Sequence, residues 1–278
     1  MSMFKKNSKQ KQVFTDGKTE INKKQKTILY QAFLKAGIGF IIIGLLAFAF
    51  GEIWIHSFLR VVDPQDFANR FVLIVLISGI SLIIVSSILS CIWSIKPFSH
   101  SLGFTLTVWI FFILCQALGF SLIIFLFGAP FMLTAFVIAA IVCFIFSLIG
   151  YSMSKKAAIT IQKIEIICLF IALSLFFGLM ITSIILIITA STIKILQITL
   201  WIYFVIFSIM LLLLILSLMQ LVSQLKTSSE FAQITNNSDQ KLAGKISWFF
   251  GYILLSQFVQ ILWYIVYILI ILSAIKRR

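Results

Sequence analysis

The sequence is poor in charged residues, which make up 11% of its 278 residues. Soluble globular domains contain about 25% charged residues, whereas this chain is 62% hydrophobic and has a mean hydropathy of +1.15. A soluble domain with this composition would expose far more apolar surface than water tolerates. The composition therefore excludes a large soluble domain and indicates an integral membrane protein.

The residues that build metal centres, disulfide frameworks and hydrolytic sites are also scarce. The chain has four cysteines and two histidines, and no two cysteines form a CxxC pair. Neither His-Glu-x-x-His nor Gly-x-Ser-x-Gly occurs, so we expect no enzymatic activity, no metal site and no cofactor. All four cysteines lie inside apolar runs, where we interpret them as small buried hydrophobic residues: Cys91, Cys115, Cys143 and Cys168.

Acidic residues number eight against 22 basic ones, which gives a net charge of +14. Such an excess can indicate nucleic-acid binding. Here, however, the basic residues occupy an N-terminal tail and the segments between apolar runs, as they do in membrane proteins. We therefore expect the lipid bilayer, and no nucleic acid, as a partner.

Long apolar runs dominate the rest of the chain. A helix needs about 20 residues to cross the ~30 Å hydrocarbon core, and seven runs are long enough. We predict an all-α fold, a polytopic membrane helix bundle with about seven transmembrane helices over residues 28–278, preceded by a disordered basic cytoplasmic tail at residues 1–27. The expected spans are 28–50, 71–95, 104–127, 131–151, 159–188, 194–222 and 246–275.

The distribution of Lys and Arg predicts the orientation. With seven crossings and a cytoplasmic N-terminus, 16 of the 22 basic residues fall inside and six outside, as the positive-inside rule requires. A full last crossing puts the terminal Lys276-Arg277-Arg278 cluster outside, so a last segment that enters and returns on the same side is an alternative. We predict seven crossings of a cell membrane, and the abundance of Ile, Phe and Lys suggests a bacterial gene.

Small residues recur on single faces of several spans. Gly37, Gly44 and Gly51 are spaced by seven residues, and Ala139, Cys143 and Ser147 by four. Such seams let neighbouring backbones approach closely, which is how transmembrane helices pack in lipid. We interpret both seams as packing surfaces.

Polar residues form one stripe on the last span. Its members lie at positions i, i+3, i+7 and i+10 of a helix, so they share one face. Lipid cannot satisfy the amides, so we expect the stripe to face the bundle, either as interhelical hydrogen bonds or as the lining of a hydrated path. The stripe comprises Gln257, Gln260, Tyr264 and Tyr267; Gln116 and Gln220, on other spans, could face it.

Only one acidic residue, Glu165, lies within an apolar span, and it lies near the edge of that span. An interfacial or paired role and a functional role both remain open for it.

The middle of the chain resembles the Bax inhibitor-1-like membrane proteins. That family has a short break, an Ala-Phe pair, a Phe-x-x-x-Ser-x-x-Gly-Tyr ending and a Lys-Lys stop; here the first interval is one residue shorter. The matching residues are Ala135-Phe136, Phe144, Ser147, Gly150-Tyr151 and Lys155-Lys156, followed by Gln224-Leu225-Lys226, Lys241-Leu242-Ala243 and the run from Gly251 to Gln260. The likeness covers residues 28–275 loosely.

The resemblance implies a passive calcium or cation leak gated by two facing aspartates. Two carboxylates at close range share a proton, and carboxylate oxygens suit calcium. In this chain the two positions carry Leu221 and Gln257, so the carboxylates of the pH gate are missing.

Two functions therefore remain open. One is a passive leak for calcium or another cation without the aspartate gate. The alternative is a non-conducting interaction or regulatory protein with unknown protein partners, such as membrane proteases. A secondary transporter is disfavoured because no charged residue lies at the middle of a span.

Overall fold

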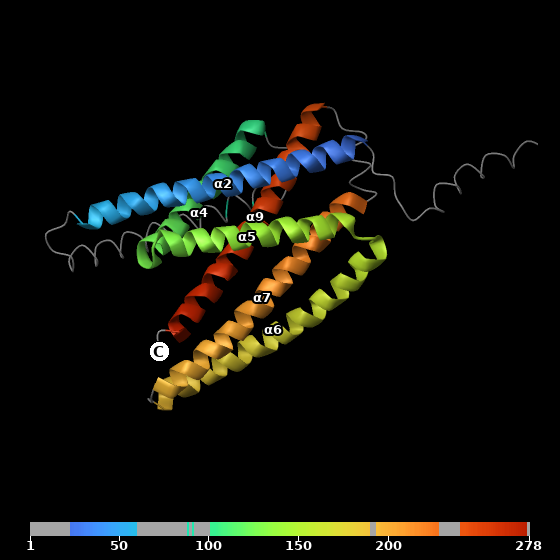
Figure 1. Cartoon of the computed structure of the whole chain (residues 1–278). Coiled ribbons are helices and arrows are strands. Elements are labelled where there is room, and N and C mark those ends of the chain that lie inside the picture. The colour runs from blue at the N-terminus through green and yellow to red at the C-terminus, as the bar shows by residue number, and fades with distance from the viewer. Residues whose placement is uncertain are drawn as a thin grey trace, which may run out of the picture.

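The computed structural model describes residues 23–59, 88, 91, 101–189, 193–227 and 240–276. Six long helices are formed there (Figure 1): α2 (Lys23–Leu59), α4 (Leu102–Phe127), α5 (Ala129–Ser152), α6 (Lys155–Thr189), α7 (Ile193–Thr227) and α9 (Gln240–Lys276). All six are long and apolar enough to cross a membrane, which confirms the predicted all-α, multi-pass membrane fold. The predicted second span, residues 71–95, lies outside the described residues.

Local sequence signals set several helix boundaries. The Ser101 hydroxyl accepts a hydrogen bond from the Phe104 backbone N–H at 3.2 Å and so satisfies one free donor of the first turn of α4. Gly128 ends α4 with a φ of +88°, a conformation that favours glycine. Pro130 lies in the first turn of α5, where its missing N–H costs nothing. The predicted break between these two spans is thus a single-residue link.

Five helices surround a common apolar core. α2 packs against α4 and α9, and α5 and α7 pack against each other and against α9; α9 crosses both α2 and α5 (Figure 1). Each of the five contributes side chains with no exposed surface, among them Ile43, Phe120, Met132, Leu218 and Leu254. By contrast, α6 packs on α7, and none of the described side chains in its Lys156–Leu175 segment is buried.

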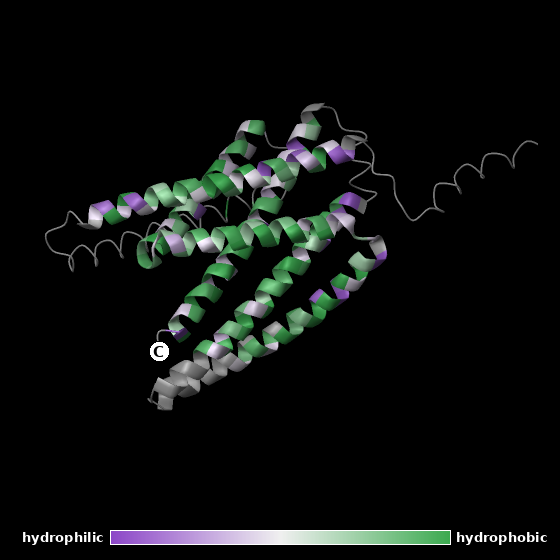
Figure 2. Cartoon of the chain, viewed as in Figure 1, coloured by the Kyte–Doolittle hydropathy of each residue, from purple (hydrophilic) through white to green (hydrophobic). Residues whose placement is uncertain are grey.

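The outer surface of the bundle is apolar. Hydrophobic residues run along the middles of the helices and hydrophilic ones gather toward their ends (Figure 2). Exposed side chains include Ile41 of α2 at 62%, Phe144 of α5 at 65% and Phe170 of α6 at 67%. Lipid covers such a surface without cost, whereas water would not.

Two contacts bring three helix termini to the same end of the bundle. Gln25 Nε2 of α2 donates to the Leu225 carbonyl of α7 at 3.0 Å, and Lys226 Nζ donates to the Tyr151 carbonyl of α5 at 2.6 Å. The first turns of α6 and α9 belong to this end as well, because only two residues separate α6 from the end of α5 and Ile246 of α9 packs against Ile28 of α2. We call it the Lys-rich end, after Lys23, Lys24, Lys26, Lys155, Lys156, Lys226, Lys241 and Lys245.

The helices extend beyond the predicted spans. Residues 23–27, predicted as tail, and residues 52–59, predicted as loop, are helical in α2. The segment between the predicted spans 194–222 and 246–275 is also partly helical, because α7 ends at Thr227 and α9 begins at Gln240. Hydropathy marks only the part of a helix inside the hydrocarbon, whereas the backbone hydrogen bonds continue through the polar ends.

α9 is one uninterrupted helix of 37 residues. At 1.5 Å per residue it is about 55 Å long, more than the ~30 Å hydrocarbon thickness. The alternative in which the last segment enters and returns on the same side is therefore wrong.

The glycines predicted as a packing seam behave differently from one another. A Cβ on Gly51 would lie 2.7 Å from Ile124 Cγ2, and one on Gly44 would lie 3.3 Å from the Phe136 ring. Close packing is thus confirmed at these two positions. A Cβ on Gly37 would meet nothing within 4 Å, so this glycine borders open space.

The α5 seam is buried as predicted. Ala139 is 0%, Cys143 3% and Ser147 8% exposed, and one turn further Gly150 touches the backbone of α7 at Met219. Among the cysteines, Cys115 and Cys143 are buried, Cys168 is half-buried and Cys91 is exposed. The prediction that all four are buried is therefore wrong for Cys91 and only partly right for Cys168.

Candidate functional site

The polar stripe of α9 does not lie wholly inside the bundle. Gln257 and Tyr264 are half-buried, whereas Gln260 and Tyr267 are exposed. Gln260 Nε2 donates to Ser256 Oγ within the same helix at 3.5 Å, and Tyr267 stacks on Phe207 of α7 with ring centroids 5.1 Å apart. The expectation that all four residues face the bundle is therefore wrong for Gln260. Tyr267 is 41% exposed but packs against α7.

Gln116, the polar residue near the middle of α4, reaches α9 through a tryptophan rather than through the stripe. Trp263 Nε1 donates to Gln116 Oε1 at 2.9 Å, and the Trp263 ring stacks on Phe120 with centroids 4.3 Å apart. The amide oxygen is therefore satisfied inside an aromatic layer.

We expect Trp263→Phe to destabilise the bundle by about 1 kcal/mol, the size of an interhelical hydrogen bond in a membrane protein. The substitution keeps an aromatic ring and leaves Gln116 Oε1 without its donor. Thermal unfolding in detergent measures the change, with Trp201→Phe, which alters an indole that is 47% exposed, as the matched control. A double-mutant cycle with Gln116→Leu should return a coupling of similar size; additive losses would contradict the pairing.

Leu221 and Gln257, which the sequence resemblance pairs with two aspartates, lie on helices that pack together. Leu221 of α7 is half-buried and packs against the main apolar core. Gln257 of α9 is half-buried as well, and its Oε1 atom is buried without a hydrogen-bond partner among the described residues. Gln220, next to Leu221, is also half-buried.

A lysine inside the first span forms a polar contact that the sequence analysis did not single out. Lys35 Nζ of α2 donates to Ser247 Oγ of α9 and lies 4.4 Å from the centroid of the Trp248 ring. The Ser247 hydroxyl in turn donates to the Gly244 carbonyl at 2.8 Å. Lys35 is the only charged residue in the predicted span 28–50, which is the signal that could have identified it.

The other polar contact between α2 and α4 lies toward the opposite end. Trp54 Nε1 donates to Ser121 Oγ at 3.1 Å, and Ser121 is fully buried. Glu165 lies on α6 and is half-buried; its role stays open.

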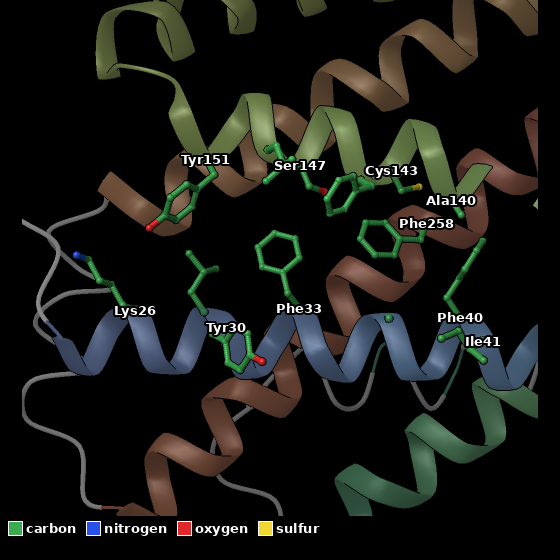
Figure 3. A pocket seen from close by; sticks show the side chains of 14 residues that line it. Lys26, Tyr30, Phe33, Phe40, Ile41, Ala140, Cys143, Ser147, Tyr151 and Phe258 are labelled. Atoms are coloured by element: carbon green, nitrogen blue, oxygen red, sulfur yellow. The ribbon is translucent and has the colours of Figure 1, made fainter. Parts of the chain in front are cut away.

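A groove of about 740 Å³ lies between α2 and α5. Phe258 of α9 forms its floor, and the side chains of the two helices line its walls (Figure 3). Its rims are open to the outside, since Tyr30 is 69% and Leu148 53% exposed. We call it the α2–α5 groove. Sequence periodicity could not have found it, because a groove depends on which neighbours fail to fill a space.

The groove closes where the two helices meet. The rings of Phe40 on α2 and Phe136 on α5 have centroids 5.3 Å apart in an edge-to-face contact, and Phe40 also touches Phe258 at 6.2 Å between centroids. At the opposite, wider part, Lys26 and Tyr151 extend toward each other from the two walls (Figure 3). The groove therefore runs from the Lys-rich end to an aromatic stop.

In comparisons with known proteins, no protein-family model, curated protein or solved structure matches the chain.

Proposed function

We propose that this chain is an integral membrane protein that acts by binding other molecules within the bilayer and does not conduct ions. Two hydrogen-bonded pairs between the described helices support this proposal. Trp263 bonds to Gln116 and Trp54 to Ser121. A side chain that is already bonded to its neighbour does not offer the free oxygens that replace the hydration shell of an ion.

One observation carries the proposal. The α2–α5 groove opens sideways, with rim residues more than half exposed, and its lining is mostly apolar. A cation path would need a continuous polar lining across the bilayer, whereas the core between the helices consists of fully buried side chains such as Leu254, Leu218 and Met132. A lateral apolar groove suits the binding of a hydrophobic ligand or a partner helix.

We also propose that the Lys-rich end faces the cytoplasm. It combines the start of α2 and α9 with the ends of α5 and α7, and cytoplasmic segments carry the excess of Lys and Arg. This orientation would put the N-terminus on the cytoplasmic side of a cell membrane and the C-terminal end of α9 on the opposite side.

The test is reconstitution of the purified protein in liposomes that contain a calcium indicator. We expect calcium entry at acidic and at neutral pH to equal that of protein-free liposomes. Entry that scales with the amount of protein would contradict the proposal.

A passive leak for calcium or another cation is the second candidate. Two features favour it: the resemblance to the Bax inhibitor-1-like family, and the buried Gln257 Oε1 atom that lacks a described partner. If this candidate is right, wild-type protein passes cations at both pH values. The double variant Leu221→Asp, Gln257→Asp should then conduct in a pH-dependent manner, because two nearby carboxylates share a proton. An unchanged pH profile would count against the family alignment.

A further inference from the structure

The α2–α5 groove has the length of one bilayer leaflet. Its wall on α2 extends from Lys26 to Ile41, which is 15 steps along the helix and corresponds to about 22 Å. A bilayer with its headgroups is about 40–45 Å thick, so half of it is about 20–22 Å. A groove of this length matches a molecule that belongs to a single leaflet.

The lining changes along the groove in the same order as a phospholipid changes from tail to headgroup. Toward the closed part it consists of Phe33, Gly37, Phe40, Phe144 and Phe258. The volume of about 740 Å³ falls within the range of about 300–1,000 Å³ that small-molecule sites occupy. This part offers space for hydrocarbon and no strong polar partner.

The open part offers cationic and aromatic groups. Lys26 is exposed at the mouth, and no ion pair to it is formed among the described residues. Tyr151 lies opposite, with Lys226 Nζ 4.9 Å from its ring centroid, so two lysines flank the mouth. Tyrosine rings and lysine ammonium groups are the side chains found at the headgroup level of membranes.

We propose that the α2–α5 groove binds one anionic phospholipid. An acyl chain lies between α2 and α5 on the floor formed by Phe258, and the phosphate contacts Lys26 at the mouth. Charge complementarity selects an anionic lipid, because Lys26 of α2 lies at the mouth, Lys226 of α7 lies beside Tyr151, and no acidic side chain lines the groove. The proposal rests on the proposed function, since it names the ligand of the same groove, and its lipid-binding tests are independent of whether the protein conducts ions.

Native mass spectrometry of the protein with phosphatidylglycerol and phosphatidylcholine tests the charge selection. We expect one phosphatidylglycerol molecule per chain to be retained about fivefold more strongly than phosphatidylcholine, the factor that one lysine contributes at a membrane surface. Lys26→Gln should remove this preference, whereas Lys163→Gln, at an exposed lysine of α6, should keep it. Equal retention of the two lipids by the wild-type protein would overturn the proposal.

Filling the groove tests the position of the acyl chain. Gly37→Leu places a side chain in the groove without a protein clash, because a Cβ there meets nothing within 4 Å. Gly178→Leu on α6 is the matched control, since a Cβ at Gly178 also meets nothing within 4 Å. Ala140→Phe, at an exposed position of the opposite wall, provides a second filling variant if Gly37→Leu does not fold.

Phosphatidylglycerol with a photoreactive group in its acyl chain distinguishes this site from ordinary lipid contact. We expect labelling of the wild-type protein on peptides that contain Phe33 and Phe144, and loss of that labelling in Gly37→Leu but not in Gly178→Leu. Labelling of α6 peptides as strong as that of α2 and α5 would mean surrounding bilayer lipid alone and would overturn the proposal. So would unchanged labelling in both filling variants. Absence of labelling at these peptides in the wild-type protein, the result expected if a segment of this chain occupied the groove, would overturn it as well.

Discussion

Replacing Gly150 with leucine should prevent α5 and α7 from packing together. A Cβ at this position would lie 2.6 Å from the Met219 carbonyl oxygen and 2.8 Å from the Met219 Cα atom. Both are backbone atoms of α7, which cannot turn aside as a side chain can. Overpacking a core costs about 1–3 kcal/mol when side chains can adjust, so we expect a larger loss here.

Size-exclusion chromatography and thermal unfolding in detergent measure this effect. Gly150→Leu should elute largely as aggregate, whereas Gly178→Leu and Gly37→Leu should elute and melt as the wild-type protein does, because neither position has a neighbour within 4 Å of the added Cβ. A monodisperse Gly150→Leu variant with the wild-type melting temperature would contradict the close contact between α5 and α7.

The second large effect is expected for Phe120→Ala in the centre of the core. Phe120 of α4 is 0% exposed, stacks on Trp263 of α9 and meets the edge of Phe136 of α5 with centroids 5.8 Å apart. Removing the ring leaves a cavity between three helices, and a buried Phe→Ala substitution costs about 3–5 kcal/mol. Transmembrane helices associate largely through such van der Waals packing, so α4 should loosen from its neighbours.

Thermal unfolding of Phe120→Ala, compared with Phe170→Ala, measures this contribution. Phe170 of α6 is 67% exposed, so its loss removes lipid contact and no core packing. We expect a clear drop in melting temperature for the first variant and none for the second. Equal changes in the two variants would show that Phe120 does not hold the three helices together.

The helical membrane fold was predictable from the composition and from the length of the apolar runs. In lipid, the backbone N–H and C=O groups can form hydrogen bonds only with each other, which favours helices. The break at Gly128 was also predictable, because glycine tolerates the positive φ that ends α4. Helix lengths were less predictable. The polar ends of α2 extend the helix outside the hydrocarbon, where hydropathy carries no signal.

The seams and the stripe show a different limit. Spacing identifies residues that share a helix face, but it does not say what that face meets. Gly44 and Gly37 belong to one seam, yet only Gly44 has a neighbouring ring against it. Likewise Gln257 and Gln260 belong to one stripe, yet only Gln260 is exposed. The direction of each face depends on how α9 crosses α2, α5 and α7, which is a tertiary property.

The contact of Lys35 with α9 could not be predicted by counting charges. In the charge count that predicts the orientation, Lys35 is one of the 16 basic residues on the cytoplasmic side, and that count identifies no partner for it. In the structure it bonds to Ser247 on α9, more than 200 residues along the chain. A contact of that kind needs the helix arrangement before it can be recognised.

The measurement that tests the central claim most directly is calcium entry into liposomes that contain the wild-type protein, at acidic and at neutral pH. Sealed protein-free liposomes set the lower limit, and an added calcium ionophore sets the upper one. Binding without conduction predicts entry equal to the protein-free value at both pH values. Entry that increases in proportion to the reconstituted protein, at either pH, would contradict the account and favour the leak.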